Sequence, residues 1–584
     1  MKWSNEAGLW LVAAVIVTLL AGLMFLADLG GLALTDRDEG EYAATVGEMV
    51  RSGDYLVPTL NGRNYLEKPI LIFWAIAGAQ AVFGPGELAA RLPSALPALA
   101  VILLVGALAW RYGGLALGVM SAAACAFTPL FVLVGRASLT DMLLTLWITG
   151  ALAAFFVAVE EQEPGRRRWW YLAAWAALGL GFLTKGPVAP AVVLPTALIY
   201  ALCQRRLWPV LKTAQIHWGL LIFLVINLPW YGLVFLRLGG EFWDAFFVAQ
   251  NLRRFSEVLL GHGGGFLLYP PVMLLGGFPF VAAALPELGR ALGRNPATAR
   301  AQDPLARLRL LAAIAALVVL VAFSLAATKQ INYILPAFPF LALLAGCYLL
   351  GLWKGQAGGR LARGVFGVAL GFSGGLMTVA VLALPAGLPL FWDKIVASIR
   401  FDSSEYALPE AAPLVALWPI LLGLTLGALL VGVWLAWRRG SLRLIPPILA
   451  SGALLGCAML FFGLLPQVAQ AIQEPAKQMA LALKERAPAD RVVSYGLWKP
   501  TMIFYLDRQI PRLRVEQQQE LAVELAKAEP VWLLSRVALA QKLAAAPGFV
   551  ELGRWGGYLL GGNQAASARW RQGQAAPAAP GDPS

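Results

Sequence analysis

Thirteen long apolar runs are the feature that most limits how this chain can fold. A helix needs about 20 mostly apolar residues to cross the core of a bilayer, and the runs approach or reach that length. Of the 584 residues, 59% are hydrophobic and 14% are charged, against roughly a quarter charged in ordinary soluble domains. The sequence therefore predicts a polytopic α-helical membrane protein. The predicted spans are residues 8–29, 88–110, 115–134, 142–159, 169–183, 187–203, 218–236, 266–285, 308–327, 331–352, 365–384, 414–437 and 444–465.

The basic residues are distributed unevenly around these spans. If the N-terminus is cytoplasmic, the turns that carry Arg166 to Arg168, Arg290 to Arg307 and Arg438 to Arg443 face the cytoplasm, as the topological bias of Lys and Arg predicts. The acidic residues then concentrate on the opposite face. The net charge of +13 is therefore explained by topology. A nucleic acid partner, which would need a basic face on a soluble domain, is not expected.

The stretch 35–69 is the most polar segment between two apolar runs, within a predicted outer loop that covers residues 30–87. Separate loops bring further charged residues to the same predicted face. Charges near membrane depth are costly and tend to line a cavity. A cavity that mixes carboxylates with cations suits a phosphate-bearing substrate. The converging residues are Asp38, Glu39, Glu67, Lys68, Arg136, Asp141, Lys185, Arg253, Arg254, His262, Lys329 and Tyr333.

Each of these residues also has a simpler explanation. Asp36 or Asp38 could cap the helix expected to begin near Glu39. Asp141 opens a span, so it could be an N-cap or the ion-pair partner of Arg136. His262 lies in a glycine-rich loop that gives it no defined role by itself. Lys68 could instead extend toward the lipid headgroups, and Lys329 and Tyr333 could be ordinary anchors at the membrane interface.

The chain divides by composition into a transmembrane domain, residues 1–465, and a mixed polar segment, residues 466–571. In the first, residues 68–83 and 241–257 form amphipathic helices that we expect at the membrane interface. In the second, helix and strand patterns alternate, which predicts a small α/β domain. The Ala- and Pro-rich tail, residues 572–584, is expected to be disordered. The predicted elements of the α/β domain are helices at 474–486, 517–527 and 537–544 and strands at 491–495, 513–515 and 531–535.

Several short motifs occur in a fixed order over roughly residues 8–339, and together they resemble a known family. They are Asp38-Glu39 followed by Tyr42-Ala43, then Ser52-Gly53-Asp54-Tyr55, Tyr65-Leu66-Glu67-Lys68-Pro69, Leu183-Thr184-Lys185-Gly186, Asn227-Leu228-Pro229-Trp230, Arg254-Phe255 and Lys329-Gln330-Ile331-Asn332-Tyr333. This series resembles the membrane glycosyltransferases of the GT-C fold. The likeness is greatest to the bacterial undecaprenyl-phosphate aminoarabinose transferases and their relatives in the protein-mannosyltransferase superfamily.

The resemblance implies a fold of about 13 transmembrane helices with an outer C-terminal domain. It also implies an inverting transfer of a sugar, 4-amino-4-deoxy-L-arabinose, from undecaprenyl phosphate to a lipid A phosphate. This reaction would occur on the periplasmic face of the bacterial inner membrane and confer resistance to polymyxin and cationic peptides. Glu41 stands where those enzymes often have an Arg, and residues 250–255 lack a His that is common there, which leaves the sugar and the acceptor open.

Other functions remain compatible with the same sequence. A related transferase could act on protein Ser or Thr residues or on another glycan. A lipid flippase or transporter would also be polytopic, but such proteins tend to show repeated halves and charged or broken helices near the midplane. No clear repeat occurs in this sequence, and the ionisable residues collect on one predicted face.

The predicted roles follow from the resemblance and from the chemistry of each side chain. The donor is an undecaprenyl-phosphate-linked sugar, the acceptor is lipid A or another envelope molecule, and membrane lipids surround a monomer. No organic cofactor is expected, and a divalent ion, Zn or Mg, would be shared by Glu67 and His262. The predicted catalytic residues are Asp38, Glu39 and Asp141. The predicted phosphate-binding residues are Lys68, Arg253, Arg254, Lys329 and Tyr333.

Overall fold

The computed structural model describes residues 2–258, 263–293, 303–400 and 407–575. The chain forms two compact units. The first, here called the bundle, comprises Met1–Leu29, Leu66–Ala383 and Leu417–Gly463. The second, here called the sheet unit, comprises Gly30–Tyr65, Leu384–Ala416 and Leu464–Ser584. Each unit is considered by itself below.

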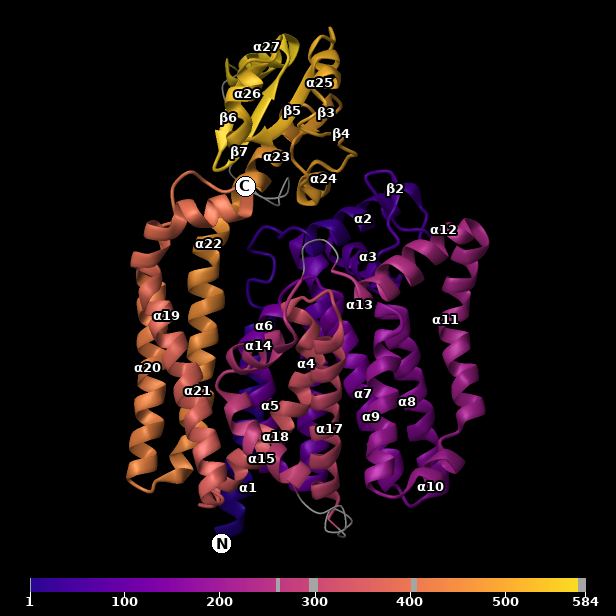
Figure 1. Cartoon of the computed structure of the whole chain (residues 1–584), viewed down its shortest axis with the longest axis vertical. Helices are drawn as coiled ribbons and strands as arrows, with labels where there is room; N and C mark the ends of the chain where they lie inside the picture. The colour runs from indigo at the N-terminus through magenta and orange to yellow at the C-terminus, as the bar shows by residue number, and fades with distance from the viewer. Residues whose placement is uncertain (1, 259–262, 294–302, 401–406, 576–584) are drawn as a thin grey trace, which may run out of the picture. The chain divides into compact units, whose positions relative to one another are not determined.

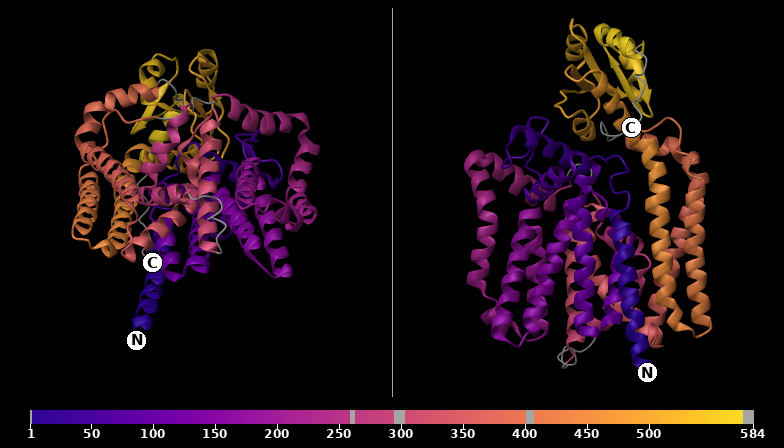
Figure 2. Two further views of the ribbon diagram at one scale, coloured as in Figure 1. Left: turned by 60° about the horizontal axis from the view of Figure 1, so that its bottom comes forward. Right: turned by 180° about the vertical axis from the view of Figure 1, so that it is seen from behind.

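Long apolar helices dominate the bundle (Figure 1). Among the described residues, nine helical segments are long and apolar enough to cross a membrane, and two of them extend into the sheet unit. α7, α8, α9 and α11 run side by side in the views of Figures 1 and 2. The nine segments are α1 (Lys2–Leu26), α4 (Glu87–Gly113), α7 (Thr140–Glu160), α11 (Ile216–Leu238), α17 (Pro304–Leu325), η3 with α18 (Ile331–Ala337, Phe338–Trp353), α19 (Arg360–Arg400), α20 (Leu417–Arg438) and the run that contains α21 (Ile445–Met459).

Two further predicted spans are bent pairs of shorter helices. α5 (Leu115–Ala126) and α6 (Pro129–Gly135) meet at 67°, and α14 (Tyr269–Gly276) and α15 (Phe280–Gly293) meet at 119°. Pro129 is the first residue of α6, and Pro279 directly precedes α15. A proline interrupts a helix because its ring removes a backbone donor and restricts the residue before it. The fifth and sixth predicted spans are α8 (Pro164–Lys185) and α9 (Val188–Cys203). Each of the thirteen predicted spans thus coincides with helix, which confirms the polytopic α-helical fold.

Shorter helices lie between these spans. The predicted helix at 68–83 is α3 (Leu71–Phe83). The predicted helix at 241–257 is helical from Gly240 to Ser256, with α12 (Gly240–Phe242), the π-helical segment η1 (Trp243–Arg253) and α13 (Arg254–Ser256). Asn251 donates its side-chain N–H to the carbonyl of Phe246 at 2.7 Å, within η1. The placement of both helices at a membrane interface stays a prediction.

The sheet unit contains a five-stranded sheet of order β4-β3-β5-β7-β6. β3 pairs in parallel with β4 and β5, whereas β7 pairs antiparallel with β5 and β6. Side chains of β3 and β5, including Val493 and Leu533, form a buried core with Leu521 and Leu525 of α25. The bounds are β3 (Arg491–Tyr495), β4 (Arg512–Leu513), β5 (Val531–Arg536), β6 (Val550–Trp555), β7 (Tyr558–Gly562) and α25 (Gln518–Leu525).

The predicted α/β character of the C-terminal segment is confirmed, although its second half was incompletely predicted. α23 (Glu474–Arg486) and β3 begin and end where expected. The hairpin of β6 and β7 was missed, although Gly556-Gly557 is a two-residue turn signal. α24 (Pro500–Leu506) and α27 (Gln564–Ala575) were missed as well. Residues 572–575 of the predicted tail belong to α27, and 576–584 lie outside the described residues.

Residues 30–65 of the predicted outer loop belong to the sheet unit. They contain α2 (Asp38–Ser52) and the short hairpin of β1 (Thr59–Leu60) and β2 (Arg63–Asn64). The backbone N–H of Leu34 donates to the Tyr505 hydroxyl at 2.9 Å, and Asn61 exchanges two hydrogen bonds with the backbone of Ile510. This part of the loop is therefore built together with the C-terminal sheet, far away in sequence.

Candidate functional site

Asp141 and Lys185 form a buried ion pair in the bundle. Their carboxylate and ammonium groups are 2.7 Å apart, and the side chains are 5% and 11% exposed. Asp141 lies in the first turn of α7, and Lys185 ends α8, which packs beside α7. Helix N-termini favour negative charge and C-termini favour positive charge, so an Asp at the start of α7 and a Lys at the end of α8 both suit their positions. Gly186 terminates α8 with a φ of 63°, a conformation that glycine adopts without strain.

The second carboxylate oxygen of Asp141 accepts a hydrogen bond from the side chain of Asn332 at 2.9 Å. The two simpler explanations for Asp141 are therefore wrong. Leu139 is the N-cap of α7, and Arg136 donates to the carbonyl of Met24 at 2.6 Å. Asp141 is held by two partners from other elements, which fixes the orientation of its carboxylate.

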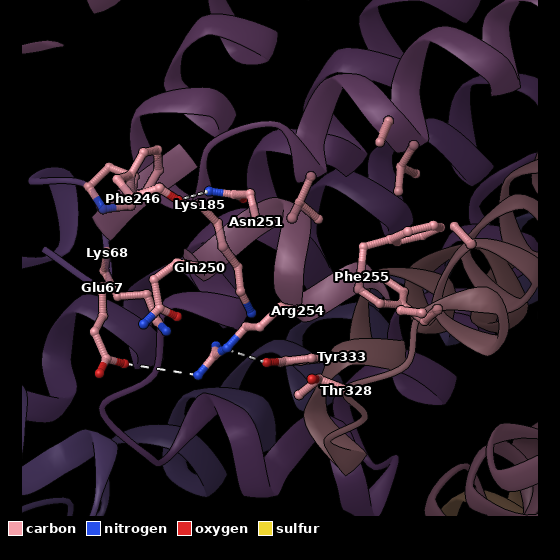
Figure 3. Close-up of a pocket in the computed structure, with 17 residues that line it drawn as sticks. Glu67, Lys68, Lys185, Phe246, Gln250, Asn251, Arg254, Phe255, Thr328 and Tyr333 are labelled. Atoms are coloured by element: carbon pink, nitrogen blue, oxygen red, sulfur yellow. Dashed lines mark hydrogen bonds and ion pairs between the residues drawn. The ribbon is translucent and has the colours of Figure 1, made fainter. Parts of the chain in front are cut away.

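Arg254 and Tyr333 form a second polar group of the bundle. The guanidinium of Arg254 donates to the Tyr333 hydroxyl at 3.2 Å and lies 3.9 Å from the carboxylate of Glu67. The ammonium of Lys185 lies 4.4 Å from the centre of the Tyr333 ring. Figure 3 shows Lys185 and Arg254 pointing into the same space beside Tyr333. The two groups are therefore linked through Lys185 and Tyr333.

Backbone hydrogen bonds hold the two segments that supply Arg254 and Tyr333. The carbonyl of Arg254 accepts from the N–H of Thr328 at 3.1 Å, and that of Phe255 accepts from Ala327 at 2.9 Å. The Thr328 hydroxyl donates to the carbonyl of Glu257 at 2.8 Å. The end of the helix from Gly240 to Ser256 is thus fixed against the connection between α17 and η3.

A cavity of about 160 Å³ opens beside these groups (Figure 3). One part of its wall is charged and the rest is mostly apolar. Lys68 is 7% exposed and lines the cavity, and no ion-pair partner for it occurs among the described residues. Three cations, Lys68, Lys185 and Arg254, thus stand against the carboxylates of Glu67 and Asp141, which leaves positive charge in excess. The lining residues are Glu67, Lys68, Pro69, Lys185, Val188, Ala191, Val192, Phe246, Gln250, Asn251, Arg254, Phe255, Ala322, Phe323, Ala326, Thr328 and Tyr333.

An anion with an apolar tail matches this wall chemically. Buried cations without a full complement of carboxylates are costly unless a ligand supplies negative charge. Guanidinium and ammonium groups bind phosphate through charge-assisted hydrogen bonds. The apolar residues of α9 and α17 offer contacts to a hydrocarbon chain.

Other predicted phosphate-binding residues occupy different positions. Arg253 is exposed and does not line the cavity. Lys329 is buried, donates to the carbonyl of Ala326 and is absent from the cavity wall. Phosphate binding by these two residues stays a prediction that the geometry of the cavity does not support by itself.

The predicted metal site rests on Glu67 and His262. His262 lies outside the described residues, and Glu67 pairs with Arg254. Within 2–258, 263–293, 303–400 and 407–575, no group of three His, Cys, Asp or Glu side chains could hold a metal ion. A divalent ion at Glu67 and His262 stays a prediction.

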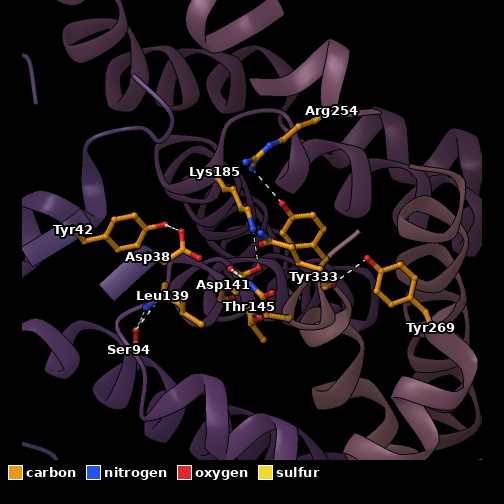
Figure 4. Close-up of polar contacts among 12 residues, drawn as sticks. Asp38, Tyr42, Ser94, Leu139, Asp141, Thr145, Lys185, Arg254, Tyr269 and Tyr333 are labelled. Carbon is orange, nitrogen blue, oxygen red and sulfur yellow. Dashed lines mark hydrogen bonds and ion pairs between the residues drawn. The ribbon is translucent and has the colours of Figure 1, made fainter. Parts of the chain in front are cut away.

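Asp38 and Glu39 belong to the sheet unit, at the start of α2. Asp38 accepts a hydrogen bond from the Tyr42 hydroxyl at 3.3 Å (Figure 4). Glu39 is 2% exposed and accepts from both the N–H and the hydroxyl of Thr35, each at 2.9 Å. The N-cap of α2 is Arg37, without a side-chain cap, and Asp38 is the first residue of the helix, so the prediction of Asp38 as its N-cap is wrong. The Asp36 carboxylate accepts hydrogen bonds from Thr501 at the start of α24.

Glu41 has a local partner in the sheet unit, since its carboxylate accepts from the Tyr65 hydroxyl at 2.8 Å. Glu41 is one of the two places at which the sequence departs from the pattern of the family that it resembles. An Arg at this position would not accept that hydrogen bond.

Four residues at the site carried no predicted role. Phe246, Gln250 and Asn251 line the cavity from η1, and Asn332 holds Asp141. The motif Lys329-Gln330-Ile331-Asn332-Tyr333 already contained Asn332, but only its charged and aromatic members were assigned. An amide is a weak signal in a sequence, because it acts through whichever partner the fold provides.

Comparison with known proteins places these features among membrane glycosyltransferases. Residues 67–232 match the family described as dolichyl-phosphate-mannose-protein mannosyltransferase. The chain is 32% identical over 444 residues to undecaprenyl phosphate-alpha-4-amino-4-deoxy-L-arabinose arabinosyl transferase 1 of Sodalis glossinidius, covering 75% of this chain and 72% of that protein. It is 31% identical to the corresponding transferase of Shewanella sediminis, over 64% of this chain and 65% of that protein.

A solved structure gives the same fold over nearly the whole chain. The crystal structure of ArnT from Cupriavidus metallidurans bound to undecaprenyl phosphate matches with a TM-score of 0.77 and 24% sequence identity. The match covers 94% of this chain and 98% of that one. At this identity the likeness shows the fold.

Proposed function

Since the chain belongs to the family of undecaprenyl phosphate-α-4-amino-4-deoxy-L-arabinose arabinosyl transferases, a group of GT-C glycosyltransferases, we propose that it transfers 4-amino-4-deoxy-L-arabinose to lipid A. The donor is the undecaprenyl-phosphate-linked sugar. The observation that carries this proposal is the bundle cavity, in which an excess of positive charge borders an apolar wall.

The phosphate of the donor binds Lys68 and Arg254, and Tyr333 orients Arg254. Lys68 supports this role because it is buried in the cavity wall with no ion-pair partner among the described residues. Arg254 is held by the Tyr333 hydroxyl at 3.2 Å, so its guanidinium is oriented before a ligand arrives. Such preorganised charge is most effective where negative charge develops during reaction.

The chemistry is a direct displacement at the anomeric carbon of the sugar. An oxygen of the acceptor forms a bond to that carbon while the bond to the undecaprenyl phosphate oxygen breaks, and the electron pair leaves with the phosphate. The cations stabilise the leaving phosphate. One displacement inverts the configuration of the anomeric carbon.

The carboxylates have separate proposed roles. Asp141 orients Lys185 at the cavity, through the pair at 2.7 Å. Asp38 acts on the acceptor and sugar, which is the role that the sequence suggests, and Glu39 supports the start of the same helix. A lipid A phosphate is already ionised at neutral pH, so it needs little help from a general base. Asp38 would then stabilise positive charge that develops on the sugar.

The reaction takes place on the periplasmic face of a bacterial inner membrane. Multiple apolar spans and family membership support a multi-pass membrane protein. The distribution of Lys and Arg around the spans supports a cytoplasmic N-terminus. Addition of a positively charged sugar to lipid A lowers the negative surface charge, so resistance to polymyxin and other cationic peptides would follow.

The test is a transfer assay with the purified full chain, the undecaprenyl-phosphate-linked aminoarabinose and lipid A. We expect lipid A to gain the mass of one aminoarabinose, and Lys68→Ala to lower transfer mainly through the donor KM. Lys354→Ala, which removes an exposed lysine beyond α18, is the matched control and should behave as the unmodified chain.

Two outcomes would overturn the proposal. One is the absence of lipid A modification under conditions in which the protein remains folded. The other is transfer of a sugar from the same kind of donor to Ser or Thr of a peptide, which would favour the activity named for the family matched at residues 67–232.

A further inference from the structure

A second buried Asp–Lys pair occurs in the sheet unit, and the proposed reaction does not use it. The carboxylate of Asp36 lies 2.6 Å from the ammonium of Lys499. The two side chains are 0% and 4% exposed. Asp36 lies two residues before Asp38, and Lys499 directly precedes α24. The pair therefore joins the start of the proposed catalytic helix to a segment more than 400 residues later in the chain.

Thr501 completes the contact. Its backbone N–H donates to one carboxylate oxygen of Asp36 at 3.0 Å, and its hydroxyl donates to the other at 2.8 Å. Both oxygens of Asp36 are thus occupied by the first turn of α24. The arrangement resembles a helix cap, except that the carboxylate caps α24 from a remote segment.

Gly40 allows α2 to approach this turn closely. A Cβ atom at position 40 would lie 2.8 Å from the backbone nitrogen of Thr501 and 2.7 Å from its side-chain methyl carbon. Backbone atoms cannot move aside as the end of a flexible side chain can. The first turns of α2 and α24 are therefore in direct contact, and glycine at this position makes it possible.

The charge state of Lys499 supports an ion pair. Burial alone would lower the pKa of Lys499, but Asp36 and Tyr558 outweigh burial and raise the pKa above its ordinary value. The ammonium is therefore charged at neutral pH. Moving a buried, charged lysine away from its carboxylate partner leaves an isolated buried charge, which is costly. Lys499 is therefore held in place more firmly than an exposed lysine would be.

We propose that Lys499 and Thr501 are positioning residues, which hold the first turn of α2 and thereby set the orientation of Asp38. The hydrogen bonds of Thr35 to Glu39 make this first turn one unit, so a displacement of Asp36 is passed to Asp38. This inference rests on the proposed function for the role of Asp38. It gives the C-terminal sheet a part in the reaction without contact with substrate.

The experiment compares two substitutions at Thr501 in the full chain. Thr501→Val keeps the shape and removes the hydroxyl donor, whereas Thr501→Ser keeps the donor. We expect Thr501→Val to lower kcat several-fold with the donor KM unchanged, and Thr501→Ser to restore it. Lys499→Met should lower kcat about 10- to 100-fold, the cost expected for a small misplacement of a reacting group. Lys484→Met, an exposed lysine of α23, is the control.

Hydrogen–deuterium exchange provides a readout that needs no substrate. In Lys499→Met, amides of residues 38–45 should exchange faster, whereas those of α7 should be unchanged. Unchanged exchange in residues 38–45 would overturn the inference, as would unchanged kcat in a chain that transfers sugar. If the unmodified chain transfers no sugar to lipid A, the proposed function fails, and exchange alone then decides whether Lys499 holds α2.

Discussion

The two buried Asp–Lys pairs of this molecule have nearly equal geometry and different surroundings. Asp141 and Lys185 are 2.7 Å apart in the bundle, and Asp36 and Lys499 are 2.6 Å apart in the sheet unit. Lys185 lines a cavity and lies against the ring of Tyr333. Asp36, by contrast, has both carboxylate oxygens bonded to α24 or the residue before it. An ion pair that borders a cavity can exchange partners with a ligand, whereas an enclosed pair can only hold two segments together.

The two regions also differ in their balance of positive and negative charge. Around the cavity, Lys68 and Arg254 add positive charge that Glu67 balances only in part. In the sheet unit, hydrogen bonds from Thr501 complete the coordination of Asp36. The difference teaches that a buried ion pair by itself is weak evidence for function. The open cavity and the unbalanced cations beside it are the informative features.

The largest difference between the two ion pairs is expected when both charges of a pair are replaced by neutral side chains. Asp141→Asn with Lys185→Gln removes both charges, so the stability lost in either single variant, about 3–5 kcal/mol for a broken buried pair, should largely return. Transfer should stay more than about 100-fold below that of the unmodified chain, because the cavity has lost a cation that is proposed to stabilise the leaving phosphate. Thermal unfolding and the transfer assay measure the two effects.

The matching variant, Asp36→Asn with Lys499→Gln, should recover both stability and most of the transfer, to within about 10-fold. The amide oxygen at position 36 can still accept from Thr501, and packing is retained. If this double variant lost transfer as completely as the bundle variant, the distinction between the two pairs would be wrong.

Tyr333→Phe tests how much the orientation of Arg254 matters. The substitution removes the hydroxyl that accepts from the guanidinium at 3.2 Å. Hydrogen bonds to charged groups are worth about 1.5–3 kcal/mol, so we expect kcat/KM for the donor to fall about 10- to 100-fold. Tyr231→Phe, which removes a tyrosine hydroxyl bonded to the carbonyl of Phe182 outside the cavity wall, is the control. An equal loss in both variants would show that Arg254 needs no help from Tyr333.

The smallest effect is expected for a pair at the surface of the sheet unit. Two hydrogen bonds from Arg491 to Glu524, each at 2.7 Å, lower the pKa of the Glu524 carboxyl below its ordinary value. A lowered carboxyl pKa stabilises the fold above the ordinary pKa, and the stabilisation disappears as the pH falls through the folded-state pKa. Surface pairs contribute about 0–1 kcal/mol.

Glu524→Gln should therefore lower the midpoint of thermal unfolding slightly at neutral pH, with no difference from the unmodified chain in strong acid. Glu485→Gln, an exposed residue of α23, is the control and should have no effect at either pH. A shift for Glu524→Gln that persists in strong acid would assign the effect to packing and not to charge.

The sequence predicted the spans well because an apolar run of span length has few other stable environments. It predicted the polar residues of the site by their rarity, as with Lys68 and Arg254. It could not predict that Asp141 would pair with Lys185 and not with Arg136, which is nearer in sequence. That choice depends on α8 packing beside α7 and ending at the same level.

The sequence by itself determined the membrane-spanning class of the protein, the order of its helices and the charged residue types that line the bundle cavity. These follow from local composition, and the stretch 35–69 could be recognised in that way. Only the tertiary structure decided that its first 31 residues, 35–65, belong with the C-terminal sheet, through Asp36, Lys499 and Thr501. The physical reason is that burial of an ion pair is a property of packing, and packing joins segments whose separation along the chain leaves no local pattern.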